Sequence, residues 1–512
     1  MLLADLLDGL HYQCRGGGSV DVDIREVTSD SRRVMAGDLF ICISGLHSDG
    51  HDFLDVVIKS KVRAVVVAED IFAEKFSADN TLLSNNSLTI IEVKCTRYAM
   101  AIIAANRYRH PAKELKTVAI TGTKGKTTTA YMIKSVLEQG GYRVGLIGTI
   151  EVIVGEHRYP AFNTTPESLL LHRYLREMAD EGMDIVVIET SSQGFKLHRT
   201  AGIIFDIGIF TNLSPDHIGY GEHTDFDEYR ECKSMLFRQC RIGLVNHDDE
   251  YCEQIIAAST CEIIRYRVMD DKDTQMSPSA NLFAAHLCAS ALSLYRENDS
   301  IGIKFVVSGC VELAVNIAIP GRFGVYNALA AILTGHYLGV SAADITHALQ
   351  TIRVKGRAEM IAVTDRFIVL IDYAHNALSL ESLLLSLREY QPQRLVCLFG
   401  CGGNRDRERR LQMGRISGEL ADFSIITSDN PRNEEPQAII DDIRSGIEAT
   451  AGEFVEIIDR SEAIAYALGN GRSGDIIVLA GKGHEDYQEI KGQRYPMDER
   501  DIIKQLCRQN SY

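Results

Sequence analysis

The chain has 512 residues, of which 45% are hydrophobic, and a formal net charge of −16. This length is too great for one ordinary core and predicts roughly two to four domains. The acidic balance disfavours nucleic acid and anionic membranes as partners, so any anionic ligand must be held by local basic groups.

The first residues of the chain and its cysteines indicate the cellular compartment in which the protein is expected. The first residues, MLLADLLDGL, carry two aspartates and no basic segment, so they predict a short amphipathic helix and not a signal peptide. The twelve cysteines lack CxxC pairs and zinc-ligand spacing, which is typical of free thiols in a reducing cytoplasm. No run of about 18 apolar residues is present, so membrane insertion is not expected. We therefore expect a cytoplasmic protein, and a monomer.

Apolar runs that recur along the chain predict buried strands. Each is followed by a glycine-rich or polar turn and then by helical periodicity, which favours parallel sheets covered by helices on both faces. The clearest runs are residues 116–121, 183–190, 205–213, 366–374, 394–400 and 474–481. We predict an α/β fold with three domains, at residues 1–110, 111–350 and 351–512.

The segment GTKGKTTT follows the first of these central runs and opens a helix predicted to stop at Gly140–Gly141. A glycine turn at a helix N-terminus directs backbone N–H groups at one point, which suits phosphate. Lys126 would reach the outer phosphates, and Thr127 or Thr128 would hold magnesium. The alternative is an ordinary turn that caps a helix, because Ile120 stands where the full phosphate-loop pattern has glycine. The predicted ATP-binding loop comprises Gly122, Thr123, Lys124, Gly125, Lys126, Thr127 and Thr128.

Two further side chains follow predicted parallel strands. Glu189 ends one strand in IETSSQ, and His217 follows another in TNLSPDH. Carboxyl ends of parallel strands lie on the side of the phosphate loop, so both could reach magnesium bound to the nucleotide. Each alone would more often be a surface or capping residue.

The order of motifs resembles the Mur ligases over nearly the whole chain. The segments that carry the resemblance are GTKGKTT, ETSSQ, TNLSPDH, GRFGVYNALAA, GRAE, DYAH, FGCGGNRDR, DNPRNEEP and GKGHEDYQ. The resemblance implies a central ATPase domain of the phosphate-loop type, flanked by an amino-terminal nucleotide-sugar-binding domain and a carboxy-terminal Rossmann-like domain. It also implies ATP as co-substrate and addition of the third residue of the peptidoglycan stem peptide to UDP-N-acetylmuramoyl-L-alanyl-D-glutamate.

The resemblance assigns roles position by position. Lys126, Glu189 and His217 match catalytic and magnesium-binding positions. Lys233 matches a lysine that becomes carbamylated and helps to position magnesium; its local sequence alone favours a solvated helix lysine. The family's uridine diphosphate contacts match Ser31 and Arg32, its muramoyl-dipeptide contacts match Asn163, Thr164, Thr165, Ser191 and Arg199, and its ATP contacts match Asn327, Arg357, Asp372, Tyr373 and His375.

The chain departs from the family pattern at a few positions. Gln193 replaces a usual histidine, Leu197 stands where some members have a polar contact, and Gly324 replaces a frequent asparagine. The segment SPDHIGYGEHTDFDEY resembles the lysine-adding branch. The reaction type is unaffected, but the identity of the added amino acid is left open.

Three carboxy-terminal loops, residues 402–407, 428–432 and 481–485, each follow a predicted parallel strand, and such loops converge on one crevice. We expect them to form an amino-acid pocket from Arg405, Asp429, Asn430, Pro431, Arg432, Gly481 and Glu485. Arginine binds carboxylate and glutamate pairs with ammonium, which suits the distal end of meso-diaminopimelate. L-Lysine would leave Arg432 without its partner. The alternative is a set of surface ion pairs between neighbouring loops.

These features predict ligation through an acyl phosphate, with domain closure that excludes water. The first hypothesis is addition of meso-diaminopimelate, and the second is the same ligation with L-lysine or another diamino acid. A folylpolyglutamate synthase would lack the DSRR…GDLF…DGHDF segment. A catalytically retired scaffold is disfavoured by intact Lys126, Glu189, His217 and Lys233.

Overall fold

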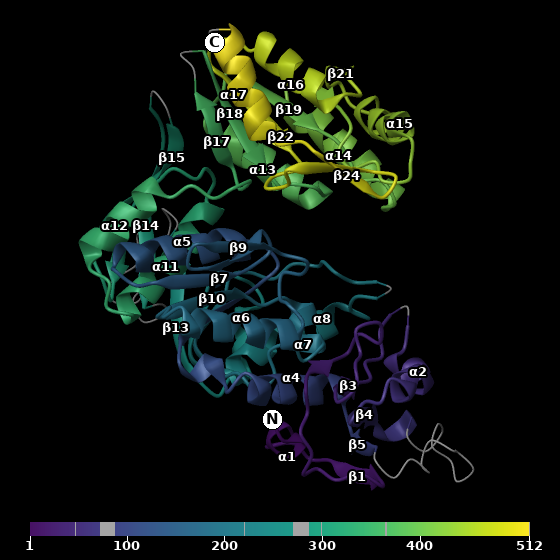
Figure 1. Ribbon diagram of the computed structural model, residues 1–512. Coiled ribbons are helices and arrows are strands. Elements are labelled where there is room, and N and C mark those ends of the chain that lie inside the picture. The colour runs from purple at the N-terminus through teal and green to yellow at the C-terminus, as the bar shows by residue number, and fades with distance from the viewer. Residues whose placement is uncertain are drawn as a thin grey trace. The chain divides into compact units, whose positions relative to one another are not determined.

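The computed structural model describes residues 1–46, 48–71, 88–219, 221–269, 286–297, 300–363 and 366–510. The chain divides into two compact units, each described here by itself. The first comprises Met1–Tyr266 and Leu333–Leu338, and the second Arg267–Ile332 and Gly339–Tyr512. Figure 1 shows the elements of both.

The amino-terminal part of the first unit contains a small sheet in the order β1-β5-β4-β3-β2. Its strands are parallel except for the antiparallel edge pair β1–β5. Helices α1 and α4 pack on one face and α2 on the other. The bounds are α1 (Leu3–Leu6), β1 (Gln13–Gly16), β2 (Val27–Thr28), β3 (Leu39–Ile41), η1 (Gly50–Phe53), α2 (Leu54–Lys59), β4 (Ala64–Ala68), β5 (Thr89–Val93) and α4 (Thr96–Arg107).

The rest of the first unit is built on strands in the order β13-β12-β11-β6-β10-β7-β8-β9. The run from β13 to β7 is parallel, and β8 and β9 add an antiparallel meander. The bounds are η3 (Pro111–Lys113), β6 (Lys116–Thr121), α5 (Lys126–Gln139), β7 (Val144–Ile147), β8 (Glu151–Val154), β9 (His157–Pro160), α6 (Ser168–Asp180), β10 (Ile185–Glu189), α7 (Ser192–Lys196), β11 (Phe205–Phe210), α8 (Phe226–Ser234), η4 (Met235–Arg238), β12 (Cys240–Asn246), α9 (Cys252–Ile256) and β13 (Glu262–Val268).

The second unit begins with the antiparallel strands β14 (Leu287–Glu297), β15 (Ser300–Gly309) and β16 (Leu313–Ile317). Helix α11 (Phe323–Tyr337) and α12 (Ala342–Thr351) follow, and the residues of α11 from Leu333 onward belong to the first unit. A second sheet then runs in the order β17-β18-β22-β19-β20-β21, with β17 antiparallel to β18 and the other pairs parallel.

Apolar side chains on alternate residues of this second sheet face opposite cores. Ile368 and Leu370 of β18 pack with α13, α14 and α15, whereas Val369 and Ile371 pack with α16 and α17. This two-sided burial is the reason for the continuous apolar runs. The bounds are β17 (Glu359–Val363), β18 (Phe367–Asp372), α13 (Ala377–Arg388), β19 (Arg394–Phe399), α14 (Arg407–Leu420), β20 (Phe423–Ile426), α15 (Pro436–Ile447), β21 (Phe454–Glu456), α16 (Arg460–Gly469), β22 (Asp475–Ala480), β23 (Tyr487–Ile490), β24 (Gln493–Pro496) and α17 (Glu499–Asn510).

The six predicted strands are confirmed as β6, β10, β11, β18, β19 and β22, all within parallel pairs. The helix after the glycine loop also ends as predicted, with Gly140 as its C-cap. Of the helices in the described residues, none combines the length and apolarity that crossing a membrane requires. The domain boundaries at residues 110 and 350 stay predictions.

Candidate active site

The glycine loop between β6 and α5 adopts a conformation that needs its glycines. Gly122 has φ 146° and Gly125 has φ 85°, both in the region that side chains disfavour. A Cβ on Gly122 would lie 2.0 Å from Thr211 Oγ1, so the neighbouring strand end leaves no room for a side chain. The loop therefore lies directly against the carboxyl end of β11.

Two residues after β11 hold this loop in place. Thr211 Oγ1 donates to the carbonyl of Lys124 at 2.7 Å. The Asn212 side chain accepts from Lys124 N at 2.9 Å and donates to the Lys124 carbonyl at 3.0 Å. The sequence-based prediction missed both residues, although both lie inside the quoted TNLSPDH motif.

Two lysines converge on one carbonyl of the loop. Lys126 Nζ donates to the Gly122 carbonyl at 2.8 Å and to the Thr123 carbonyl at 3.1 Å. Lys233 Nζ, from α8, donates to the same Gly122 oxygen at 2.8 Å and lies 4.5 Å from the centre of the Tyr229 ring. The loop thus carries two amino groups where an anionic ligand would bind.

The local-sequence interpretation of Lys233 as a solvated helix lysine is wrong. The side chain is 1% exposed because α8 packs Tyr229, Cys232 and Lys233 against the core and the loop. Burial, reinforced by the charge of Lys126, holds the pKa of Lys233 well below its usual value. The amine is therefore biased towards its neutral, nucleophilic form.

Glu189 lies at the end of β10 and is fully buried. Its Oε2 accepts from Thr127 Oγ1 at 2.9 Å and from Thr149 Oγ1 at 3.0 Å, and its Oε1 accepts from Thr149 N at 3.0 Å. A buried carboxylate beside a hydroxyl at the start of α5 is the oxygen-rich donor set that Mg²⁺ favours. Glu189 and Thr127 therefore fit magnesium, and Thr149 was missed from the sequence.

His217 lies in a different environment. It is exposed, has φ 55°, and its Nδ1 lies 3.1 Å from Glu222 Oε1. Its ring centre is 6.1 Å from that of Tyr229, whose hydroxyl is 3.0 Å from Thr123 Oγ1. The structure therefore brings His217 near the edge of the loop without a hydrogen bond to Glu189.

Several predicted muramoyl-dipeptide contacts form one network beside Glu189. Thr165 Oγ1 donates to the Glu189 carbonyl at 2.9 Å and accepts from Ser191 N at 2.9 Å. Arg199 Nη1 donates to the Thr165 carbonyl at 2.9 Å, and Thr164 Oγ1 lies 3.0 Å from Thr149 Oγ1. Asn163 is exposed beside this network.

The predicted uridine diphosphate contacts lie in a loop of the amino-terminal part. Arg32 is 87% exposed in its side chain and pairs through Nε and Nη2 with Asp30 at 2.9 Å. The hydrogen bonds from Arg32 lower the pKa of Asp30 to about 2. Ser31 is half-buried between them. The loop thus presents an arginine to solvent.

The predicted ATP contacts of the second unit gather at the end of β18. Asp372 accepts from Ala358 N at 2.7 Å, and the Arg357 guanidinium lies 4.9 Å from the centre of the Tyr373 ring. His375 Nδ1 lies 2.8 Å from the Tyr373 carbonyl oxygen. Asn327 is buried on α11, apart from this group in the chain.

The three carboxy-terminal loops meet through Asn430. Its Nδ2 donates to Glu485 Oε2 at 2.8 Å, and its Oδ1 accepts from Lys482 Nζ at 3.2 Å. Lys482 is fully buried and also bonds Glu485 Oε2 at 3.3 Å and lies 3.9 Å from Asp429. Gly481 has φ 112°, and a Cβ there would lie 2.7 Å from Asp429 Oδ2. Lys482 was missed, although it lies within the quoted GKGHE.

Arg432 lies at the rim of this group. Its Nη1 donates to the Gly403 carbonyl at 2.8 Å, and its Nε donates to Glu489 Oε2 at 3.3 Å. Pro431 is buried behind it, and Arg405 is exposed without a hydrogen bond to the other predicted residues among those described. Glu489, on β23, was missed from the sequence.

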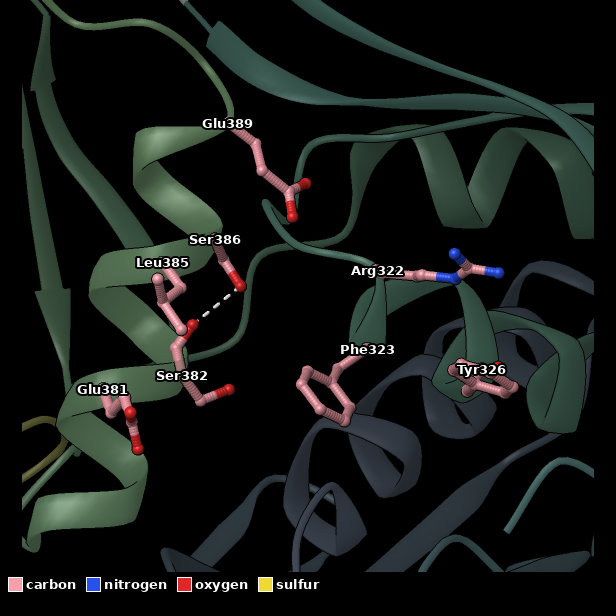
Figure 2. Close-up of a pocket in the computed structure, with 8 residues that line it drawn as sticks. All are labelled: Arg322, Phe323, Tyr326, Glu381, Ser382, Leu385, Ser386 and Glu389. Carbon is pink, nitrogen blue, oxygen red and sulfur yellow. Dashed lines mark hydrogen bonds between the residues drawn. The ribbon is translucent and has the colours of Figure 1, made fainter. Parts of the chain in front are cut away.

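A cavity of about 530 Å³ lies elsewhere in the second unit, between the start of α11 and α13. Figure 2 shows its lining side chains, with Ser386 Oγ donating to the Ser382 carbonyl at 2.8 Å. None of the predicted site residues lines it, although Tyr326 precedes Asn327 in the chain. It is therefore separate from the loops described above. The lining residues are Arg322, Phe323, Tyr326, Glu381, Ser382, Leu385, Ser386 and Glu389.

Three family models match successive parts of the chain. They are described as Mur ligase family, catalytic domain, at residues 23–108; Mur ligase middle domain, at residues 120–335; and Mur ligase, glutamate ligase domain, at residues 356–483. All the predicted catalytic residues lie within the middle-domain match.

Curated proteins and solved structures agree with these matches. The chain is 39% identical over 508 residues, 99% of each chain, to a UDP-N-acetylmuramoyl-L-alanyl-D-glutamate--2,6-diaminopimelate ligase of Caldanaerobacter subterraneus subsp. tengcongensis. It is 36% identical over 98% of its length and 99% of the relative to the protein of the same name from Clostridium perfringens. A solved structure with that name matches at 27% identity with a TM-score of 0.65, covering 96% of both chains. Because the domain models follow one another along the chain and the relatives match it from end to end, the chain belongs to the Mur ligase family.

Proposed function

We propose that this protein uses ATP to join meso-2,6-diaminopimelate to the D-glutamyl side-chain carboxylate of UDP-N-acetylmuramoyl-L-alanyl-D-glutamate. The observation that carries this proposal is the full-length likeness to ligases named for 2,6-diaminopimelate. The reaction belongs to peptidoglycan precursor synthesis, and a cytoplasmic, monomeric enzyme forms part of the proposal.

The first step transfers the γ-phosphoryl group of ATP to the substrate carboxylate. A carboxylate oxygen forms a bond to phosphorus while the bond to the β-phosphate oxygen breaks, which gives an acyl phosphate and ADP. Lys126 would release the Gly122 and Thr123 carbonyls, which its Nζ now contacts at 2.8 and 3.1 Å, and bind the phosphates. Backbone N–H groups at the start of α5 would add to this positive field.

Magnesium would be held by Thr127 and Glu189, with His217 and Lys233 as further candidates from the family resemblance. When bound, it neutralises charge on the outer phosphates. The hydrogen bonds of Thr149 to both carboxylate oxygens orient Glu189 for that role. His217 would have to exchange its contact with Glu222 to take part.

We also propose that Lys233 is carbamylated. Its buried amine, biased towards the neutral form, would attack the carbon of CO₂ and lose a proton, which gives a carbamate. This change would place an anion that can bind a metal ion beside Lys126. The environment of the Lys233 amine supports the modification.

In the second step the amine of the amino acid attacks the acyl carbon, phosphate leaves, and the amide forms. The amino acid would be held by Asp429, Asn430, Arg432 and Glu485, with Arg405, Pro431 and Gly481 completing the pocket. The uridine diphosphate group would meet Ser31 and Arg32. The dipeptide would lie on the network of Thr164, Thr165, Ser191 and Arg199, with Asn163 at its edge.

L-Lysine is the second candidate amino acid, and the ion pair between Arg432 and Glu489 supports it. L-Lysine would leave Arg432 without a ligand carboxylate, yet Arg432 already pairs with Glu489 and donates to the Gly403 carbonyl. The penalty against L-lysine is therefore smaller than an unpaired buried charge would impose. L-Lysine therefore stays the second candidate amino acid.

The test is ADP release by the purified chain with UDP-muramoyl dipeptide and each of several amino acids. We expect release that requires both the dipeptide and meso-diaminopimelate, with a product mass that gains one diaminopimelyl residue. Turnover with L-lysine alone would replace the first candidate by the second. No ADP release with any amino acid would favour a retired scaffold.

A further inference from the structure

Two cysteine thiols lie side by side in the first unit, apart from the residues assigned to substrates. Cys240 is the first residue of β12, and Cys261 directly precedes β13. The Cys240 thiol donates to Cys261 Sγ, with 3.5 Å between the two sulfur atoms, and neither cysteine belongs to a disulfide. A disulfide needs about 2 Å between its sulfur atoms, so a shift of roughly 1.5 Å would allow a bond between them.

Hydrogen bonds hold the backbone on both sides of this pair. The Gln239 carbonyl accepts from Phe205 N at 2.7 Å, and the Phe237 carbonyl accepts from Thr260 N at 3.1 Å. Directly after these positions, β12 and β13 pair as adjacent parallel strands. The fold itself therefore sets the proximity of the two sulfur atoms, and little further ordering is needed for them to react.

The two thiols differ in their access to solvent. Cys240 is 6% exposed and packs in the core with Phe205 and Leu236. A Cβ on Gly208 would lie 2.8 Å from Cys240 Sγ, so the glycine of β11 leaves the space that this thiol occupies. Cys261 is half-buried. A small reagent from solvent would therefore reach Cys261 before Cys240.

The hydrogen bond between the thiols also distinguishes their chemistry. Burial raises the pKa of both thiols, and the S–H group donated by Cys240 partly offsets this rise at Cys261. The thiolate is the reactive form of cysteine, so Cys261 is the group that reacts first. Because both pKa values lie above the usual value, the thiolate fraction near neutral pH is small and grows with pH.

We propose that Cys240 and Cys261 form a reversible disulfide when the protein is exposed to a small disulfide as oxidant. The Cys261 thiolate attacks one sulfur of the oxidant, whose S–S bond breaks, and a mixed disulfide and one free thiolate result. The Cys240 thiol loses its proton, attacks Cys261 Sγ and displaces the second thiolate. The two cysteines lose two electrons and two protons in total, and the small disulfide is reduced to two thiols. Excess thiol reverses both steps, so the bond is transient in a reducing compartment.

The bond would stabilise the first unit at a distance from the glycine loop. Cys240 and Cys261 lie at the amino ends of β12 and β13, whereas Thr211 and Asn212, which hold the glycine loop, follow the carboxyl end of the neighbouring parallel strand β11. The seven residues of β12 separate its two ends by roughly 20 Å. A cross-link that closes a loop of about 20 residues restricts the unfolded chain and so favours the folded one.

Peptide mapping tests the proposal on the whole reduced chain, with 2-hydroxyethyl disulfide as the oxidant. The remaining thiols are alkylated, and the chain is digested with trypsin without reduction. We expect a cross-linked species of the Cys240 peptide and the 242–265 peptide, lighter than their sum by two hydrogens. It should form about tenfold faster at pH 8 than at pH 7. Fragmentation places the bond on Cys261, because Cys252 lies in the same peptide.

Single substitutions provide matched controls. Cys261→Ala and Cys240→Ala should each abolish the cross-link, whereas Cys252→Ala, which removes another buried thiol, should leave it intact. Oxidised wild-type protein should melt roughly 5 °C above its reduced form, and dithiothreitol should remove this gain. Neither alanine variant of the pair should show the gain. The melting temperature of each reduced variant shows whether it has folded.

The contrary outcomes are distinct. Mixed disulfides on Cys261 without the cross-link, or modification of the exposed Cys14 and Cys310 alone, would overturn the proposal. A cross-link that leaves the melting temperature unchanged would overturn the stabilising role of the bond. None of these measurements needs a substrate. Failure of ADP release with every amino acid would therefore overturn the proposed function and leave this inference standing.

Discussion

The glycine loop and the carboxy-terminal loops differ in the groups that bind their charged side chains. At the phosphate loop, Lys126 and Lys233 both donate to the Gly122 carbonyl, and the nearby Glu189 is bonded by threonines. At the carboxy-terminal loops, Arg432 pairs with Glu489 and Lys482 with Glu485. The first site holds two amino groups on one backbone carbonyl, whereas the second holds its charged groups in ion pairs.

This difference matches the ligands proposed for each site. A lysine held by backbone carbonyls can turn to phosphoryl groups and stabilise the charge that grows and shifts during transfer. A site of matched pairs has little net attraction for a simple anion or cation, and favours a ligand that carries both charges in the same arrangement. Substitutions at each site test this difference.

Removal of Lys126 should have the largest effect. Lys126→Ala should lower kcat by about 10³-fold, because a phosphate-binding cation is lost at the point of charge development. The measurement is ADP release at saturating ATP. Lys134→Ala serves as the control, since Lys134 lies further along α5 and pairs with Glu138. A loss of less than tenfold in Lys126→Ala would contradict a phosphate-binding role.

Lys233 tests whether the buried amine beside the glycine loop is carbamylated. Lys233→Ala should lower kcat by roughly 10²-fold, and short carboxylates such as acetate should restore part of the activity by taking the place of the carbamate. Activity is compared with and without acetate, using chloride at equal ionic strength as the control. Failure of every short carboxylate to restore activity would argue that Lys233 acts as an unmodified amine.

Arg432 tests the paired site. Arg432→Ala should raise the KM for meso-diaminopimelate by roughly 10- to 100-fold, since a charge-assisted hydrogen bond is lost. The KM for ATP should change less than twofold, because Arg432 belongs to the amino-acid loops. Initial rates with each substrate varied in turn provide the comparison. Equal increases in both KM values would count against specific recognition.

His172 tests how far burial lowers a pKa, the effect that is also invoked for Lys233. It is 1% exposed, and neither ring nitrogen has a hydrogen-bond partner among the described residues. Burial lowers the pKa of His172 to about 4 from its ordinary 6.5. Above pH 6.5 both folded and unfolded chains keep this group neutral, and between 6.5 and 4 only the unfolded chain takes up the proton. Stability is therefore lost as the pH falls through this window.

The expected loss follows from the linkage between pKa and stability. At pH 5 it is about 2 kcal/mol relative to pH 8. His172→Leu should remove this loss. The difference in free energy of unfolding between variant and wild type should therefore change by about 2 kcal/mol between pH 8 and pH 5. Denaturant unfolding at the two pH values measures it, with His157→Leu as the exposed control. If the difference in free energy of unfolding between variant and wild type were the same at pH 5 and pH 8, burial would not keep His172 neutral.

Much of the fold and part of the site could be predicted from sequence. The apolar runs form strands because helices cover both faces of the sheet. The glycine loop could be recognised because its conformation at positions 122 and 125 is one that side chains disfavour, so glycines stand there in the sequence. The burial of Lys233 could not be predicted, since its helix, FDEYRECKS, is mostly polar and only tertiary packing turns one face inward. Thr149 and Glu489 were missed because they act through neighbours distant in the chain.

The most direct test of the central claim is a competition in one vessel. The chain is supplied with UDP-muramoyl dipeptide, ATP, and equal concentrations of meso-diaminopimelate and L-lysine, and the products are resolved by mass. We predict that the diaminopimelyl product exceeds the lysyl product by at least about tenfold, as expected when one charge-assisted hydrogen bond is lost. Equal amounts of the two products, or an excess of the lysyl product, would contradict the account.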